Sequence, residues 1–106
     1  MLIDLLKIYQ LSRAIPSGSF HVLARMAKVT EEVGEFAEST LVTNGYMRKD
    51  LKEPQAGELV DVIITAVDTW LQSNPQFDLQ AAESELQTWL DTKFDKWAAK
   101  YPEIKV

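Results

Sequence analysis

Two short acidic stretches of the chain have the residue types and the spacing of a metal site. In the first stretch Glu32 and Glu35 are three positions apart, and in the second Glu58 and Asp61 have the same spacing. Side chains three or four residues apart share one face of an α-helix, because each residue turns the helix by about 100°. If both stretches are helical and face each other, four carboxylates are brought together.

Four carboxylates in a region of low dielectric constant repel one another unless cations lie between them. Mg²⁺ and Mn²⁺ prefer oxygen ligands, and Mg²⁺ is commonly held by carboxylates together with substrate phosphates. The spacing thus allows a site for Mg²⁺, with Mn²⁺ as the alternative ion, whose ligands would be Glu32, Glu35, Glu58 and Asp61. On spacing alone an ordinary solvated helix face is the favoured interpretation, and for Thr65 and Asp68, which continue the second stretch, both interpretations are equally open.

Together the two stretches resemble the pattern E-E-x-x-E, followed at variable distance by E-x-x-D, of the all-α NTP pyrophosphohydrolases of the MazG-like superfamily. The resemblance covers about residues 20–102, and the acidic positions of the pattern are filled by Glu31, Glu32, Glu35, Glu58 and Asp61. It implies a MazG-type helical domain that uses Mg²⁺ to convert a (deoxy)nucleoside triphosphate to the monophosphate and pyrophosphate. It also implies a homodimer or homotetramer with sites at subunit interfaces.

We also predict roles for residues other than the metal ligands. Glu31 lies about 100° around the helix from Glu32, so we predict that it orients or deprotonates the attacking water; a supporting role or a second ion are the alternatives. Lys28 is one turn before Glu32 and either contacts a phosphate or, as we favour, pairs with that carboxylate. Lys96 and Lys100 resemble the basic segment that holds the triphosphate in family members, although lysine near a helix end also has a dipole explanation.

The composition limits the other kinds of chemistry. The 106 residues include no cysteine and one histidine, which excludes thiol nucleophiles, disulfides and cysteine-based zinc sites. A net charge of −5 argues against binding to a nucleic-acid backbone, but free nucleotides stay possible because metal ions can bridge two anionic partners. We find neither a membrane-spanning apolar run nor a signal-peptide pattern. We predict one cytoplasmic domain over residues 1–106, with no nucleic-acid or membrane partner.

The segments that position the carboxylates are predicted to be helices, and no segment has the alternating apolar pattern of a strand. Apolar residues recur every three or four positions in four segments: about 1–14, 20–43, 54–73 and 79–101. Ser17 or Ser19 could cap the second segment, and Asp78 suits the N-cap of the last. Gly34 lies inside the second segment, where it costs about 1 kcal/mol relative to alanine, so we predict that another helix approaches closely there. The fold class is all-α, a four-helix bundle.

Two other functions stay open at this point. One is an enzyme of the same superfamily that is specific for dUTP, dCTP or phosphoribosyl-ATP. The other is a non-catalytic helical interaction module whose acidic face binds a basic partner.

Overall fold

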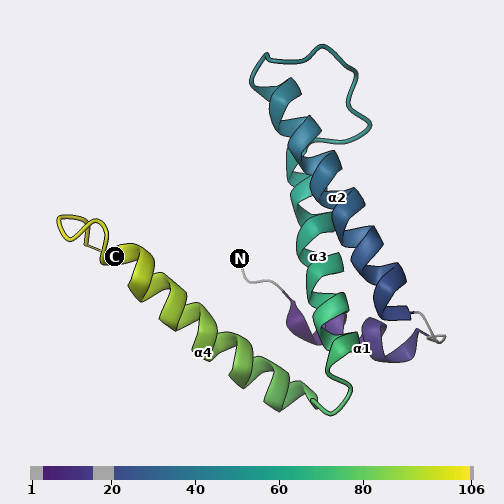
Figure 1. Cartoon of the computed structure of the whole chain (residues 1–106), viewed down its shortest axis with the longest axis vertical. Helices are drawn as coiled ribbons and strands as arrows, with labels where there is room; N and C mark the ends of the chain where they lie inside the picture. Colours follow the sequence, from purple (N-terminus) through teal and green to yellow (C-terminus); the bar gives the residue numbers. More distant parts are fainter. Residues whose placement is uncertain (1–3, 16–20, 106) are drawn as a thin grey trace. The chain divides into compact units, whose positions relative to one another are not determined.

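The computed structural model describes residues 4–15 and 21–105. Within these residues the chain forms no strand, and its helices are α1 (Leu5–Ala14), α2 (His21–Thr43), α3 (Gln55–Ser73) and α4 (Leu79–Ala98), as Figure 1 shows. The predicted all-α class is confirmed. In the described part of the chain no helix combines the length and the apolar character needed to cross a bilayer. The chain divides into two compact units, Met1–Pro75 and Gln76–Val106, and each is described by itself.

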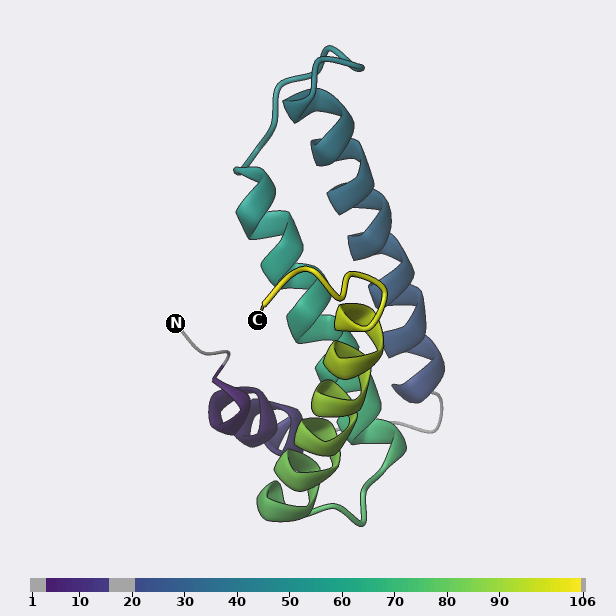
Figure 2. The same cartoon turned by 90° about the vertical axis from the view of Figure 1, so that its left-hand side faces the viewer.

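In the first unit α2 and α3 lie side by side and run in opposite directions, joined by a connector over residues 44–54 (Figures 1 and 2). The end of α2 is closed by two backbone hydrogen bonds, from Gly45 N to Val42 O at 3.1 Å and from Tyr46 N to Leu41 O at 2.9 Å. Gly45 has a φ of +79°, which glycine adopts without steric cost. The predicted end of this helix at residues 43–45 is confirmed.

Polar contacts hold α2 against α3. Arg25 Nε lies 2.8 Å from Asp68 Oδ2, and the two side chains are only 15% and 24% exposed. Nearer the connector, Gln55 Nε2 donates to Thr40 Oγ1 at 2.8 Å. Asp68 is therefore not part of a solvated face, because one oxygen of its carboxylate forms an ion pair between the helices. Its role in supporting a metal ligand stays a prediction.

Helix α1 lies against the C-terminal end of α3 (Figure 2). Asp4 caps it by accepting a hydrogen bond from Lys7 N at 3.1 Å. At its other end, Arg13 donates to Leu71 O at 2.8 Å and to Asn74 O at 3.0 Å, which ties α1 to the C-terminal end of α3. The predicted first helix is confirmed from residue 5 onwards. Residues 1–3 and the predicted serine caps lie outside the described residues.

In the second unit, α4 begins as predicted, because Asp78 accepts a hydrogen bond from Ala81 N at 2.7 Å. The helix ends at Ala98, and the prediction that it continues to residue 101 is wrong. Tyr101 precedes Pro102, and the proline ring disfavours helical backbone at the residue before it. The packing of α4 into a four-helix bundle stays a prediction.

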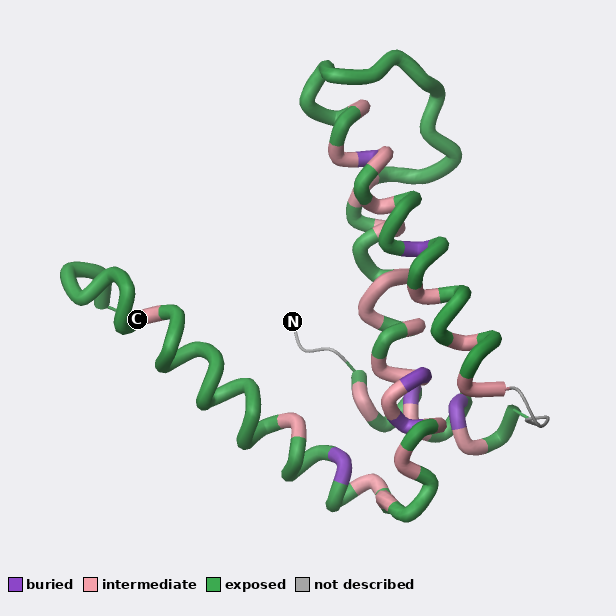
Figure 3. Tube along the Cα trace, in the orientation of Figure 1, coloured by how far each residue is buried: buried purple, intermediate pink, exposed green. Residues whose placement is uncertain are grey.

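The burial pattern of α2 differs from that of an ordinary amphipathic helix (Figure 3). Its buried residues are Glu32 and Ser39, whereas its exposed apolar residues include Leu23, Met26 and Val33. Helices of small proteins normally bury the apolar face and expose the charged one. In α2 a polar face is turned inward and much of the apolar face is left uncovered.

Gly34 is exposed, and among the described residues nothing lies within 4 Å of a Cβ built on it. The prediction of a close helix approach at Gly34 is wrong. A glycine with close neighbours is found instead at Gly57, in the first turn of α3.

Candidate metal centre

Three of the four predicted ligands converge between α2 and α3. Glu32, Glu58 and Asp61 each present a carboxylate oxygen, and these oxygens all lie within 4.8 Å of one another. Glu32 comes from the middle of α2, and the other two come from the first two turns of α3. The antiparallel packing of the two helices brings these parts together. We call these three residues the carboxylate cluster.

The cluster is poorly supplied with hydrogen-bond donors. The Glu32 side chain is only 7% exposed, and its Oε1 lies 3.0 Å from Lys28 Nζ. Glu32 Oε2 and Glu58 Oε2 are buried, and neither has a hydrogen-bond partner in the part of the chain that the structure describes. A buried polar oxygen without a partner costs free energy, more so when it is ionised. A divalent cation would satisfy both oxygens, and a set of carboxylate oxygens fits the preference of Mg²⁺ and Mn²⁺.

Glu35 lies beside the cluster and not within it. The residue is exposed. A hydrogen bond with the Glu32 carboxyl and the charge of that group raise the pKa of Glu35 above 4.5, with smaller effects from loss of water and from the charges of Glu58 and Glu31. Glu35 is therefore near the carboxylate of Glu32 but outside the group of converging oxygens. Its role as a metal ligand stays a prediction.

Lys28 forms the predicted pair with Glu32. Its Nζ also lies 3.5 Å from Glu31 Oε1, and both side chains of that second pair are more than half exposed. The hydrogen bond with Glu32 and the charges of Glu31 and Glu32 raise the pKa of Lys28, so it is a cation at neutral pH. Glu31 is thus on the solvent flank of the cluster, and its role as a base stays a prediction.

The remaining predicted phosphate contacts lie in the second unit. Lys96 is in the last turn of α4, and Lys100 follows that helix. Their predicted contact with the triphosphate stays a prediction.

Glu53 is an acidic residue beside this site that the helical pattern does not predict, and it is not one of the three residues whose oxygens converge. It belongs to the connector, immediately before Pro54, and the residue as a whole is exposed. Loss of water around its carboxyl raises the pKa of Glu53, and so do a hydrogen bond with the Asp61 carboxyl and the charges of Asp61, Glu58 and Glu32. Residues 53, 57 and 61 are four apart, which is a signal for one helix face. However, Glu53 lies before Pro54 and outside α3, so a search for residues on one face of that helix does not include it.

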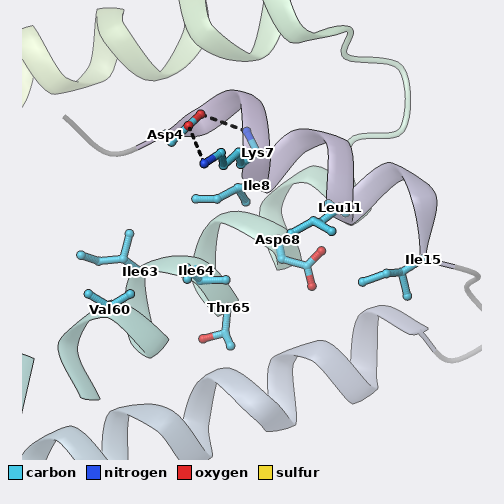
Figure 4. A pocket seen from close by; sticks show the side chains of 11 residues that line it. Asp4, Lys7, Ile8, Leu11, Ile15, Val60, Ile63, Ile64, Thr65 and Asp68 are labelled. Atoms are coloured by element: carbon cyan, nitrogen blue, oxygen red, sulfur yellow. Dashed lines mark hydrogen bonds and ion pairs between the residues drawn. The ribbon is translucent and has the colours of Figure 1, made fainter. Parts of the chain in front are cut away.

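A pocket of about 510 Å³ lies between α1 and α3 (Figure 4). Most of its lining is apolar and includes Ile8, Leu11 and Ile64, while Thr65 also contributes to it. The Thr65 hydroxyl donates to the backbone oxygen of Asp61 at 2.7 Å. Val60 and Ile63 also line the pocket, which therefore extends along α3 from the level of the carboxylate cluster to Asp68.

The raised pKa values predict how the stability of the metal-free protein depends on pH. Glu35 and Glu53 hold their protons more tightly in the folded state than the 4.5 of the unfolded chain. The folded state then binds more protons, so these groups lower the stability increasingly as the pH rises through and above about 4.5. We expect the Glu35→Gln/Glu53→Gln double variant to be more stable than the wild type near pH ~8, and the difference to shrink toward pH ~4.5.

Urea denaturation in the presence of a chelator measures this difference at each pH. Glu83→Gln, at an exposed position of α4, is the control and should show no such trend. A constant difference between the double variant and the wild type across the pH range would contradict the expectation.

No protein-family model matches the chain, and comparisons with curated proteins and with solved structures find no match.

Proposed function

We propose that this protein is a Mg²⁺-dependent nucleoside triphosphate pyrophosphohydrolase, which converts a (deoxy)nucleoside triphosphate to the monophosphate and pyrophosphate. The observation that carries the proposal is the convergence of Glu32, Glu58 and Asp61, with buried carboxylate oxygens that have no hydrogen-bond donor. The same residues fill positions of the acidic pattern that resembles the MazG-like superfamily. Pattern and geometry thus point to the same chemistry from separate observations.

In this proposal the chain's own side chains hold and orient the reactants. The carboxylate cluster binds the metal ion, which when bound neutralises phosphate charge and lowers the pKa of a coordinated water. Glu31, exposed beside the cluster, accepts the proton of the attacking water. Lys28, Lys96 and Lys100 are the proposed cationic contacts of the triphosphate. The apolar pocket between α1 and α3, which Val60 and Ile64 line, is the proposed place of the nucleoside.

The burial of Glu32 supports a metal site over an acidic docking face. A carboxylate that binds a basic partner protein has to be accessible, and the Glu32 side chain is 7% exposed. Glu31 and Glu35 are exposed and would suit such a face, but they do not belong to the converging group. A docking face for a basic partner would therefore account for the exposed Glu31 and Glu35, but it would not account for the buried Glu32.

We further propose that the protein is a homodimer or a homotetramer. The large exposed apolar residues of α2 are Leu23, Met26, Val33 and Leu41. Exposed apolar side chains that gather on one side of a helix are typical of protein interfaces. A second copy would cover the face that α2 turns outward.

The proposal is tested by pyrophosphate release from a panel of ribo- and deoxynucleoside triphosphates, with Mg²⁺ and with chelator. Because the cluster needs a cation to bind phosphates, we expect release with Mg²⁺ and none with chelator. The panel includes dUTP, dCTP and phosphoribosyl-ATP, so the substrate ranking also separates the specific enzymes of the superfamily. A folded protein that releases no pyrophosphate from any compound would exclude the proposed reaction.

A further inference from the structure

Helix α4 carries a stripe of large apolar side chains that is uncovered. Leu90, Phe94 and Trp97 recur every three or four residues, so they share one face of the helix. Their exposed fractions are 46%, 56% and 64%. Burial of aliphatic and aromatic side chains of this size is a main source of binding free energy. We call this stripe the aromatic face of α4.

The second uncovered surface is the outward face of α2, and it contains smaller residues. It lies on the side of the helix away from Glu32 and Ser39, which α2 buries. None of its residues is charged. Thr30 and Ala37 leave room along its middle, so bulky side chains of another helix can pack there. The face consists of Leu23, Met26, Thr30, Val33, Ala37 and Leu41.

A border of negative charge follows one edge of the outward face of α2. Glu31 and Glu38 lie on this edge, and each contacts a lysine of its own chain, Lys28 and Lys49 respectively. Glu35 lies between them on the same side of the helix and is exposed. Three carboxylates beside two ammonium groups leave this edge with a net negative charge.

One edge of the aromatic face of α4 is positive, because the exposed Lys93, Lys96 and Lys100 follow it. Viewed from the N-terminus of a right-handed helix, residue numbers increase clockwise. In that view the glutamates lie clockwise from the outward face of α2, whereas the lysines lie counterclockwise from the aromatic face. Two facing helices therefore bring these opposite charges together only when they run parallel. Complementary charge of this kind selects partners and fixes their orientation.

The connector between α3 and α4 limits which copy of α4 can cover the outward face. Residues 74–78 span at most about 18 Å when fully extended. The path from α3 to the far side of α2 covers two helix-to-helix distances, about 16–20 Å. Residues 75 and 76 form a turn, which shortens the connector. It is therefore too short to carry α4 of the same chain to that face, whereas a second copy has no such limit.

We propose that α4 of one copy packs parallel to α2 of a second copy, with Leu90 over Thr30 and Trp97 over Ala37. The two pairs have the same offset in sequence, so a single register satisfies both. In a two-fold dimer each copy provides both faces, so the contact forms twice and the buried area doubles. The proposed contact rests on the homo-oligomer proposed above, and it does not depend on the proposed reaction.

Disulfide cross-linking tests the contact directly, because the chain has no cysteine of its own. After mixing and mild oxidation of single-cysteine variants, we expect a covalent dimer from Thr30→Cys with Leu90→Cys and from Ala37→Cys with Trp97→Cys. The exchanged combinations are displaced by about 10 Å along the helices and should not cross-link. Thr92→Cys, on the opposite side of α4, is the control and should cross-link with neither α2 variant.

Sedimentation of cysteine-free variants measures the same contact independently. We expect Trp97→Ala to raise the Kd of the dimer at least about tenfold, as for a large aromatic residue in the centre of an interface. Thr92→Ala should leave the Kd unchanged. Circular dichroism of each variant verifies that the helices are retained.

The outcomes distinguish this contact from the proposals on which the function depends. A wild type that is monomeric at every concentration would overturn both the contact and the homo-oligomer, and would leave the reaction to be judged by pyrophosphate release. An oligomer that gives no cross-link in the two matched combinations and is unaffected by Trp97→Ala would overturn the contact alone. Cross-linking of Thr30→Cys with itself would instead indicate that α2 packs against α2.

The double variant Thr30→Cys/Leu90→Cys tests the choice of a second copy. In dilute solution we expect it to form disulfides between chains, which give a covalent dimer on a non-reducing gel. A disulfide within one chain, which gives a monomer of changed mobility, would show that α4 covers α2 of its own chain and would overturn the proposal. Cross-linking of the exchanged combinations in place of the matched ones would overturn the parallel orientation.

Discussion

Asp61→Asn is expected to lower Mg²⁺-dependent pyrophosphate release by at least about a hundredfold, since even groups that only support metal ligands typically contribute tenfold to a hundredfold. Asparagine keeps the size of the side chain and one oxygen but removes the charge that holds the cation. The same loss is expected for Glu58→Gln, because both residues contribute to the group of oxygens within 4.8 Å of one another. Initial rates over a range of Mg²⁺ concentrations distinguish a weakened metal affinity from a lowered maximal rate.

Two controls accompany this measurement. Glu83→Gln removes a carboxylate at an exposed position of α4 and should leave the rate unchanged. Thermal denaturation shows whether the metal still binds, because Mg²⁺ at a hundred times its Kd should stabilise the wild type by about 2.7 kcal/mol and the Asp61→Asn variant by much less. Full activity of Asp61→Asn at ordinary Mg²⁺ concentrations would remove the cluster from the mechanism.

Arg25→Met is expected to lower the free energy of unfolding by about 2–3 kcal/mol, as for other hydrogen bonds to partly buried charges. The Arg25 guanidinium lies 2.8 Å from the Asp68 carboxylate between α2 and α3, where the two side chains are 15% and 24% exposed. Among residues 4–15 and 21–105, the other carboxylate oxygen of Asp68 has no hydrogen-bond partner and is buried. Loss of Arg25 would leave this negative charge with little water and without its ion-pair partner. Urea denaturation measures the change.

The double variant Arg25→Met/Asp68→Leu identifies the cause. Once both charges are removed, most of the lost stability should return, because the penalty comes from the unpaired carboxylate. Lys7→Met is the matched control, since Lys7 pairs with Asp4 at 3.9 Å on the surface and should contribute no more than about 1 kcal/mol. If the double variant is as unstable as Arg25→Met alone, the ion pair is not what holds the two helices together.

The helices were predictable because their ends depend on local chemistry. Asp78 caps α4 through its own side chain, and Gly45 ends α2 through a backbone conformation that glycine adopts easily. Pairs three residues apart also gave the ligand candidates. The face of α2 that is buried, in contrast, depends on packing against α3. The hydrophobicity of the residues alone did not indicate that Glu32 is buried while Val33 is exposed.

The two glycines and the connector show why other parts of the site were not predictable. From the sequence alone, Gly34 and Gly57 are both expected to destabilise a helix relative to alanine. Only the neighbours of each glycine in the structure show that Gly57 leaves room for the Glu53 side chain. Glu53 precedes the helix, so no helical periodicity includes it. Its position depends on how the chain enters α3 at Pro54, which has an extended backbone with a ψ of 157°.

The small number of buried apolar residues affects how this protein folds. In the described ranges 4–15 and 21–105, only Ile8, Leu71 and Ala82 are apolar and buried. Burial of apolar surface is the main free-energy gain that offsets the loss of chain entropy. If copies of the chain cover the exposed face of α2, as we propose, association supplies part of that gain. Folding and assembly would then be one equilibrium, and the melting temperature would depend on protein concentration.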